Sequence, residues 1–221
     1  MKRMLKILIL LSALYTLSAC TPATRPASTS LTTPTALPQS TSAPVSNTPV
    51  APGTAIASPA GACASPAAKT LPMTEGPYFK ANSPERSNLL AAGMPGTKLG
   101  LSGYVLGMDC KPVAGALLDF WQANADGQYD NSGYTLRGHQ FSDATGHYQL
   151  TTVIPGLYPG RTEHIHVKVQ APNGSILTTQ LFFPGVADNN SDGIFDPSLL
   201  MAMQDAPDRK TATFTFVIDT P

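Results

Sequence analysis

Apolar and polar positions follow three different patterns along the chain. An unbroken apolar run covers residues 7–17, few large apolar residues occur between 21 and 64, and short alternating runs fill 65–221. Alternation with a period of two is typical of β-strands, because successive side chains of a strand point to opposite faces. The pattern therefore predicts one β-domain over residues 65–221, preceded by two segments of different character.

Six alternating segments are the predicted strands of this domain. They are rich in Val, Leu, Thr, Phe and Tyr, and turn sequences such as ADG, DATG and APNG separate them. Only the short stretches 85–93 and 197–204 have a helical pattern. Regular strands without crossover helices favour an all-β sandwich of the immunoglobulin or transthyretin-like type, with very little helix. The predicted strands cover 99–107, 115–123, 146–153, 164–170, 176–183 and 211–218.

The first 20 residues have the layout of an export signal. Basic residues precede the apolar run, which is too short for a membrane span. The run ends in Leu-Ser-Ala followed by Cys20, which resembles a bacterial lipoprotein signal whose cysteine becomes the lipidated first residue. We therefore expect a signal peptide over 1–20 and a protein exported to the cell envelope and lipid-anchored to a bacterial membrane. An ordinary secretory signal is the alternative, and it too exports the protein.

Residues 21–64 consist mainly of Pro, Thr, Ser and Ala. Such a segment cannot bury enough apolar surface to offset the entropy lost on ordering. We expect a disordered tether that holds the β-domain away from the membrane surface.

Charge and cysteine content narrow the partners of the domain. Fourteen basic residues balance fourteen acidic ones, and no basic run follows the first few residues, which argues against nucleic acid as a partner. Besides Cys20 the chain contains Cys63 and Cys110. Export to an oxidising compartment favours a Cys63–Cys110 disulfide, with two free thiols as the alternative. The sequence leaves open whether the protein forms a homo-oligomer.

Two histidines share one face of the predicted strand 164–170. His164 and His166 alternate with apolar residues at 165, 167 and 169, so both imidazoles point away from the core. Together they supply two of the donors that a metal site needs. Tyr129 and Tyr158 are further candidates, because phenolates are hard, anionic ligands that suit ferric iron. A zinc site would call for additional Cys, His or carboxylate ligands.

Several segments resemble, in order, the intradiol ring-cleavage dioxygenases of the catechol and protocatechuate type, and among them the exported branch. These segments are TEGPYF (74–79), WQANADGQY (121–129), LRGHQFSDATGHYQLTTVIPGLYPGR (136–161), HIH (164–166) and TTQLFF (178–183). The resemblance implies a non-haem Fe(III) site. Its implied ligands are Tyr129, Tyr158, His164 and His166.

The same resemblance implies the reaction. An aromatic 1,2-diol would be cleaved with O2 between its two hydroxylated carbons to give a muconate-type diacid. Tyr158, displaced from the metal, would act as a base. Arg161 would stabilise negative charge, Gln180 would orient either Arg161 or a hydroxide on the metal, and Pro77 and Tyr78 would line the substrate pocket. The sequence does not identify the diol.

Other interpretations compete for parts of this pattern. The segments 103–120 and 142–158 also fit transthyretin-like modules, so a non-catalytic surface β-sandwich is the main alternative. A cupin-type ferrous or zinc enzyme could use the two histidines alone, but no Glu follows them in VKVQAPNGS. Tyr134 competes with Tyr129 as the first ligand.

Three further features are expected to have no role in the chemistry. DNNSDGIFD (188–196) has the look of a calcium loop, but Leu199 occupies the position of the bidentate Glu, so we expect a polar turn. His139 and His147 are expected to be surface residues without partners.

Overall fold

The computed structural model describes residue 63 and residues 67–221. The predicted signal peptide, the lipidation site Cys20 and nearly all of the predicted tether lie outside the described residues. Among the described residues, no helix has the length and apolarity needed to cross a membrane.

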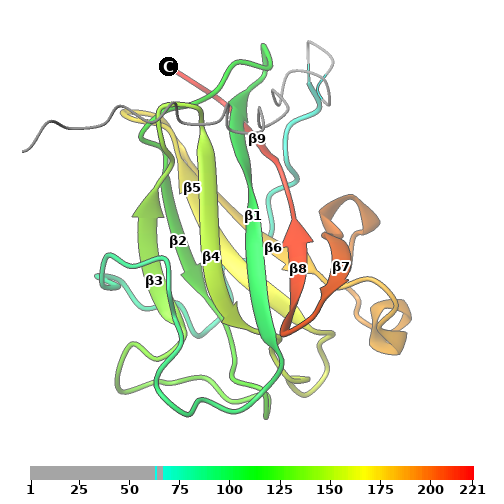
Figure 1. Ribbon diagram of the computed structural model, residues 1–221. Coiled ribbons are helices and arrows are strands. Elements are labelled where there is room, and N and C mark those ends of the chain that lie inside the picture. Colours follow the sequence, from blue (N-terminus) through cyan, green and yellow to red (C-terminus); the bar gives the residue numbers. More distant parts are fainter. Residues whose placement is uncertain (1–62, 64–66) are drawn as a thin grey trace, which may run out of the picture. The chain divides into compact units, whose positions relative to one another are not determined.

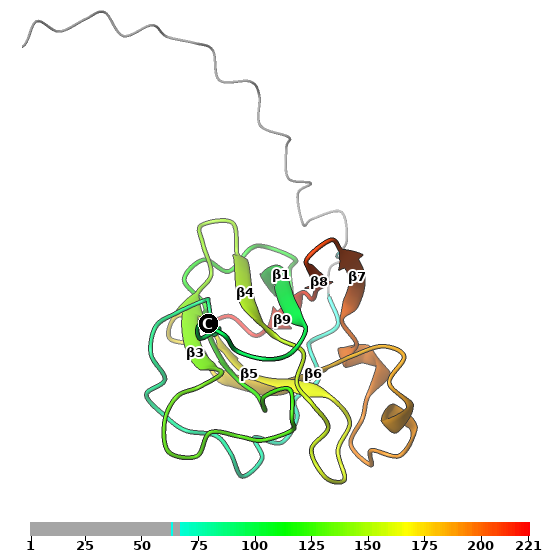
Figure 2. The ribbon, with the colours of Figure 1, turned by 60° about the horizontal axis from the view of Figure 1, so that its bottom comes forward.

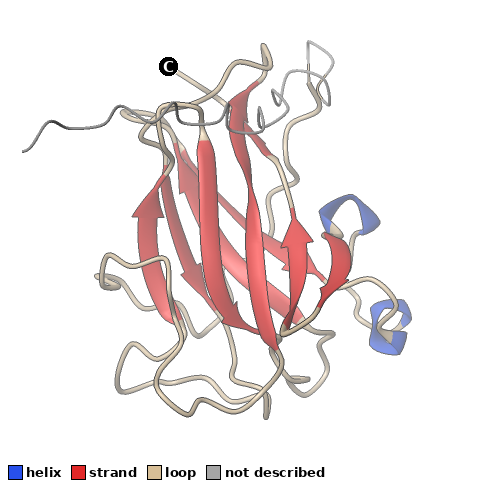
Figure 3. Ribbon diagram, in the orientation of Figure 1, coloured by secondary structure: helices blue, strands red, loops and turns tan. Residues whose placement is uncertain are grey.

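Strands dominate the described part of the chain, and helix is confined to two short 3-10 turns (Figure 3). The turns are η2 (Ala187–Asn190) and η3 (Pro197–Leu199). The strands are β1 (Lys98–Gly107), β2 (Leu117–Trp121), β3 (Arg137–Phe141), β4 (His147–Val153), β5 (His164–Gln170), β6 (Ile176–Phe182), β7 (Ala202–Ala206), β8 (Arg209–Thr213) and β9 (Phe216–Ile218).

These strands form two sheets packed face to face (Figures 1 and 2). One sheet has the order β4-β1-β8-β7, with β9 also pairing with β1, and the other has the order β3-β2-β5-β6. Strand β1 is antiparallel to β4 and parallel to β8 and β9. The architecture is therefore the predicted β-sandwich with almost no helix.

Alternation along the strands builds the core between the sheets. Leu99, Leu101 and Val105 of β1 are buried, and so are the apolar residues of β5 at 165, 167 and 169. Each such side chain contributes about 1.5–3 kcal/mol when it is removed from water. Because β5 places these residues inward, its histidines point to the outer face of the β3-β2-β5-β6 sheet.

Neither of the two helix candidates forms an α-helix. Residues 85–89 form an extended strap across the open side between the edge strands β3 and β4: the Arg86 amide donates to the His139 carbonyl and the Leu89 amide to the Thr151 carbonyl. In 197–204, a single 3-10 turn is followed by β7, which pairs with β8. Hydrogen-bond donors and acceptors on neighbouring strands outweigh the weak local helix propensity in both places.

The sequence pattern did not predict strands β3 and β7, and it predicted β8 and β9 as one strand. Residues 137–141 (RGHQF) contain Gly and charged or polar residues, so their apolar alternation is weak, yet they pair along all of β2. The predicted strand 211–218 is interrupted between β8 and β9, where the Phe214 amide donates to the Ser102 carbonyl. Both strands then continue to pair with β1 on either side of this point.

The segment before β1 is held along the sandwich. Cys63 and Cys110 form a disulfide. Three backbone hydrogen bonds follow the disulfide. The Ala67 amide donates to a carbonyl in the turn after β1, the Thr70 amide to a carbonyl of β9 and the Met73 amide to a carbonyl of β6. The segment thus reaches the outer face of β5 and β6, where the histidines lie.

Candidate functional site

Two histidines and two tyrosines converge on the outer face of the β3-β2-β5-β6 sheet. The Nε2 atoms of His164 and His166 are 3.1 Å apart, and the Tyr129 hydroxyl lies 3.3 Å from His164 Nε2. The Tyr129 and Tyr158 rings are 6.1 Å apart, edge to face. The Tyr78 hydroxyl is 2.9 Å from that of Tyr158, and the Tyr78 ring stacks on Tyr129 at 4.3 Å.

Strand register fixes the two imidazoles. His166 lies opposite Trp121 of β2 and Gln180 of β6. The Trp121 indole stacks on the His166 ring, with centroids 4.8 Å apart and planes inclined by 9°. His164 and His166 are both buried, so the imidazoles have little freedom to turn.

The two tyrosines come from loops whose backbones touch. A side chain at Gly127 would place its Cβ 2.0 Å from the Leu157 carbonyl oxygen, and one at Gly156 would lie 2.2 Å from the Ala125 oxygen. The Gly156 amide donates to the Asn124 carbonyl over 2.8 Å. Glycine is required for this close approach. The turn before Tyr129 and the turn before Tyr158 therefore form one unit.

Hydrogen bonding and burial keep the imidazoles neutral, so that each can offer a nitrogen lone pair to a metal ion. His164 Nδ1 donates to the Thr162 carbonyl over 2.6 Å, which leaves a lone pair on Nε2. Burial lowers the pKa of His164 to about 4 and the pKa of His166 well below its usual value. Burial also raises the pKa of the Tyr129 phenol well above its usual value. Without a cation the cluster therefore holds neutral imidazoles and a protonated phenol at neutral pH.

This cluster fits a hard cation such as Fe(III). Two neutral Nε2 atoms that face each other over 3.1 Å repel unless a cation or proton lies between them. His166 Nδ1 and Trp121 Nε1 are buried without a hydrogen-bond partner among the described residues. No three His, Cys, Asp or Glu side chains come together within the described part of the chain. The phenols are thus the groups that would supply anionic oxygen donors once a cation replaces their protons, which favours ferric iron over zinc.

A guanidinium is fixed beside the cluster. Arg161 Nε donates to Asp192 over 2.8 Å, and its Nη2 donates to the Gln180 side-chain oxygen over 2.6 Å. Gln180 is fully buried, and its own Nε2 donates to the Thr74 carbonyl over 2.9 Å. Two acceptors on two sides hold the Arg161 plane in one orientation.

Asp192 is the anchor of this arrangement, and its side chain is only 2% exposed. One of its oxygens also accepts from the Thr162 amide over 3.0 Å, and the other accepts from the Ile194 amide over 3.0 Å. Burial opposes ionisation, but these amides and Arg161 outweigh it and hold the pKa of Asp192 below its usual value. The loop that looked like a calcium site is a turn whose central carboxylate binds Arg161.

The remaining predicted residues are placed as follows. Pro77 is exposed, one residue before Tyr78. The Tyr134 hydroxyl donates to the Ala81 carbonyl and does not join the cluster. His139 is half-buried with Nδ1 2.7 Å from the Ser83 carbonyl oxygen, so it is no isolated surface residue. His147 Nδ1 lies 4.0 Å from Asp143, so it too has a neighbour.

Sequence reasoning missed the parts played by Trp121, Thr162 and Asp192. Trp121 begins one of the motif segments, but its stacking on His166 depends on how β2 and β5 align. Thr162 contacts Asp192 through its backbone amide and His164 through its backbone carbonyl. Any residue type has these atoms, so the sequence does not indicate such contacts. Asp192 lies in the loop that resembles a calcium site, and nothing in that sequence indicates that its carboxylate pairs with Arg161.

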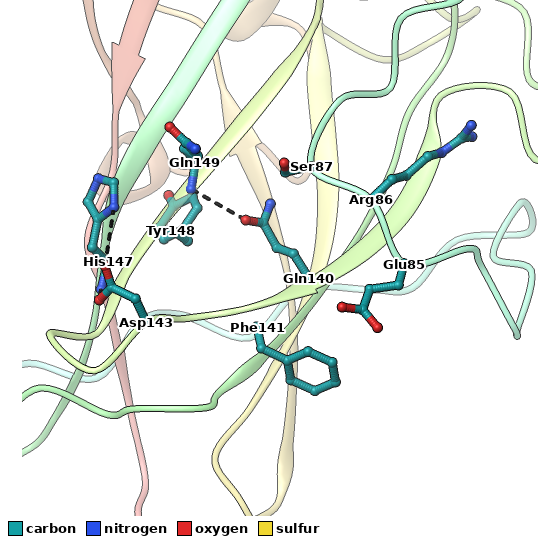
Figure 4. A pocket seen from close by; sticks show the side chains of 9 residues that line it. All are labelled: Glu85, Arg86, Ser87, Gln140, Phe141, Asp143, His147, Tyr148 and Gln149. Carbon is teal, nitrogen blue, oxygen red and sulfur yellow. Dashed lines mark hydrogen bonds and ion pairs between the residues drawn. The ribbon is translucent and has the colours of Figure 1, made fainter. Parts of the chain in front are cut away.

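Two cavities border the cluster, and a third lies elsewhere. A cavity of about 510 Å³ includes Tyr158 and Arg161, and one of about 260 Å³ includes Tyr129. The third, of about 520 Å³, lies between β3, β4 and the strap (Figure 4). It contains none of the four converging residues and no cluster of metal donors. Cavity size alone therefore does not locate the site, whereas the convergence of donors does.

Comparison with known proteins adds independent information. The family model Dioxygenase_C, described as dioxygenase, matches residues 74–219. The chain is 30% identical over 151 residues to the 6-chlorohydroxyquinol 1,2-dioxygenase of Cupriavidus pinatubonensis, covering 57% of this chain and 55% of the relative. It is 34% identical over 137 residues to catechol 1,2-dioxygenase 2 of Acinetobacter lwoffii, covering 50% of each. The chain spans about half the length of the curated relatives it matches.

Solved structures give the same picture over a larger share of the fold. The dioxygenase domain of a dioxygenase carbohydrate-binding protein fusion from Streptomyces sp. SirexAA-E is 52% identical, with a TM-score of 0.68 over 70% of this chain and 100% of that domain. Hydroxyquinol 1,2-dioxygenase from Pseudomonas putida DLL-E4 is 27% identical, with a TM-score of 0.63 over 69% of this chain and 67% of that one.

Proposed function

Because the chain belongs to the intradiol ring-cleavage dioxygenase family, we propose that it is a non-haem Fe(III) enzyme acting on an aromatic 1,2-diol. It cleaves the ring between the two hydroxylated carbons and gives a muconate-type diacid. The observation that carries the proposal is that two neutral imidazoles and two phenols lie together on one face of the sheet beside a fixed guanidinium.

In this proposal Tyr129, Tyr158, His164 and His166 hold the ferric ion, which supplies Lewis acidity toward the bound diol. The reaction balances without another reductant: one ring C–C bond breaks, the diol gives four electrons to O2, and both oxygen atoms end in the diacid. The protein must therefore orient the diol, move its protons and stabilise the charge that develops on the ring.

The phenol pair is placed to move a proton. As a phenolate, the Tyr158 oxygen would accept a proton from one hydroxyl of the diol. Tyr78 lies within hydrogen-bond distance of that oxygen, at 2.9 Å, and steadies the released phenol. The edge-to-face contact of the two rings, with centroids 5.4 Å apart, keeps Tyr78 in position for this.

Arg161 is placed to stabilise negative charge. Asp192 and Gln180 engage its Nε and Nη2, and Nη1 has no partner within the described part of the chain. A guanidinium fixed in advance stabilises developing charge without reorganising during the reaction. Gln180 acts through Arg161, as a positioning residue.

The alternative, a non-catalytic surface module, explains the fold but not the buried polar groups. A buried polar atom without a partner costs about 1–3 kcal/mol. This chain retains two such atoms in the stacked pair of Trp121 and His166. A sandwich that served only as a scaffold would gain stability from apolar residues there.

The test is a visible absorption spectrum of the full-length chain loaded with ferric iron. Tyrosinate bound to Fe(III) absorbs broadly in the visible, so we expect a coloured protein whose band shifts with catechol and which then consumes O2. Tyr129→Phe should weaken and shift the band, because one of the two proposed tyrosinate ligands is lost, and lower turnover about a hundredfold or more. Tyr134→Phe, which alters a tyrosine outside the cluster, is the matched control. A protein that stays colourless with ferric iron would contradict the proposal.

A further inference from the structure

The cavity that opens onto Tyr158 and Arg161 is where the substituents of a bound diol would lie. Its volume is about 510 Å³, larger than the cavity on the Tyr129 side at about 260 Å³. Both the displaced base and the charge-stabilising guanidinium of the proposed function border it. A diol bound beside Tyr158 and Arg161 would therefore direct its substituents toward this cavity. Its other lining residues are Leu157, Pro159, Gly160, Asp188, Ser191 and Asp192.

The charges of this cavity do not suit an anion. Arg161 is its single cation, and its Nε is already paired with Asp192 over 2.8 Å. Asp188 is half-buried and forms no ion pair with any described residue. One cation against two carboxylates leaves a net charge of −1 on the lining. A substrate carboxylate would meet an unneutralised negative charge without a counter-ion.

Other cations near the cluster are already engaged as well. Lys168 forms an ion pair with Glu75 over 2.5 Å and lies over the Phe79 ring. Arg137 donates to the backbone carbonyls of Tyr78 and Asp130. Lys80 donates to two backbone carbonyls of the turn at 132–133. A substrate carboxylate would therefore compete with these contacts for each cation.

A substrate carboxylate would compete with the reaction for Arg161. Its Nε and one N–H of Nη2 are engaged by Asp192 and Gln180, so Nη1 and the second N–H of Nη2 are the donors left for the substrate. A carboxylate bound there would withdraw these donors from the reacting carbon. Leu157 and Pro159 form an apolar part of the lining, and Leu157 is 50% exposed. These side chains can contact an uncharged substituent.

Resting on the proposed function, we propose that the substrate is an uncharged aromatic diol, and that Asp188 disfavours diols carrying a carboxylate. Catechol and its alkyl, hydroxyl or amide derivatives belong to the accepted class. Ring carboxylates of the protocatechuate kind fall outside it. Asp188 acts here as a specificity determinant through its charge.

The test compares two diols of equal shape and different charge, 3,4-dihydroxybenzamide and 3,4-dihydroxybenzoate. With the ferric full-length chain, oxygen uptake gives kcat/KM for each, and anaerobic titration of the visible band gives each dissociation constant without turnover. We expect the amide to be favoured about tenfold or more in both, with the ratio falling as salt is added. Asp188→Asn should reduce the ratio. Asp205→Asn, a carboxylate on the exposed strand β7, should leave it unchanged.

The outcomes separate the two proposals. If the carboxylate is bound and cleaved as well as the amide, the substrate class is wrong while the dioxygenase function stands. If the amide is favoured but Asp188→Asn leaves the ratio unchanged, the role assigned to Asp188 is wrong. If the ferric protein has no tyrosinate band and cleaves neither diol, the proposed function fails and the substrate class fails with it.

Discussion

The guanidinium of Arg161 shows how much of this site depends on single polar contacts. Asp192 receives hydrogen bonds from Arg161 and from the amides of Thr162 and Ile194. Thr162 in turn provides the carbonyl that orients His164. One buried carboxylate therefore connects the charge-stabilising residue to the segment that carries a proposed ligand.

Replacing this carboxylate tests the connection. Asp192→Asn keeps the size of the side chain but removes its charge, so Arg161 loses a fixed partner. We expect kcat for catechol to fall about 10–100-fold, while the visible band of the ferric protein keeps its position because the ligands remain. Asp208→Asn, which alters an exposed ion pair, is the control. A band lost together with the activity would show that Asp192 is needed for the ligands themselves.

The lowered pKa of Asp192 gives the same substitution a pH signature. The folded protein binds this proton less tightly than the unfolded chain does, so the carboxylate contributes stability above its usual pKa of 3.8. That contribution disappears as the pH falls through the lowered value in the folded state. Urea unfolding of metal-free protein at pH 7 and pH 3 should therefore show a larger gap between wild type and Asp192→Asn at pH 7. A gap independent of pH would refute this account.

At the scale of elements, the two tyrosine loops act as one unit because their backbones are in contact. Gly127 has a φ of +76°, and its missing side chain leaves room for the Leu157 carbonyl. Asn124 joins the loops through the hydrogen bond from Gly156. The separation of Tyr129 and Tyr158 is thus set by backbone packing one to five residues before each phenol.

Gly127→Ala should break this unit. The new Cβ would lie 2.0 Å from the Leu157 oxygen, so one loop must move. We expect a loss of about 2–4 kcal/mol in the free energy of unfolding and a weakened visible band with ferric iron. Gly93→Ala is the matched control: its φ is +72° and nothing lies within 4 Å of the added Cβ. It should cost about 1 kcal/mol and leave the band intact.

For the whole domain, the chain before β1 ties distant parts together. The disulfide Cys63–Cys110 closes a loop of 47 residues in sequence. Within that loop the segment around Tyr78 crosses the proposed site, where it packs against Tyr129 and Tyr158. The disulfide and the backbone hydrogen bonds to β6 and β9 together hold this segment in place.

Removing the disulfide should affect stability more than the site. The double variant Cys63→Ser with Cys110→Ser gains conformational freedom in its unfolded state, so we expect it to lose about 2–4 kcal/mol of stability. The bonds from Thr70 and Met73 remain and keep the segment near Tyr78 in register. Thermal unfolding measures the loss, and an unchanged visible band with ferric iron checks the site. A band that disappears would show that the disulfide positions the segment directly.

Local sequence patterns were enough to predict most strands of this protein and the four proposed metal ligands. Alternation located β1, β4, β5 and β6 closely, because the side chains of a strand reverse face at each residue wherever the strand lies. The same rule placed His164 and His166 on one face. The motif segments named Tyr129 and Tyr158, which the fold brings beside those histidines. The export signal, the lipid anchor and the metal itself remain predictions from sequence and family.

Tertiary structure alone decided the contacts between distant segments. Strand β3 and the strap at 85–89 exist because neighbouring strands offer hydrogen bonds, which local propensity does not reveal. Arg161 and Asp192 are 31 residues apart in sequence, and the stacking of Trp121 on His166 follows from the alignment of β2 with β5. Residue type and spacing fix which face a side chain takes, whereas its partner depends on how the whole chain is folded.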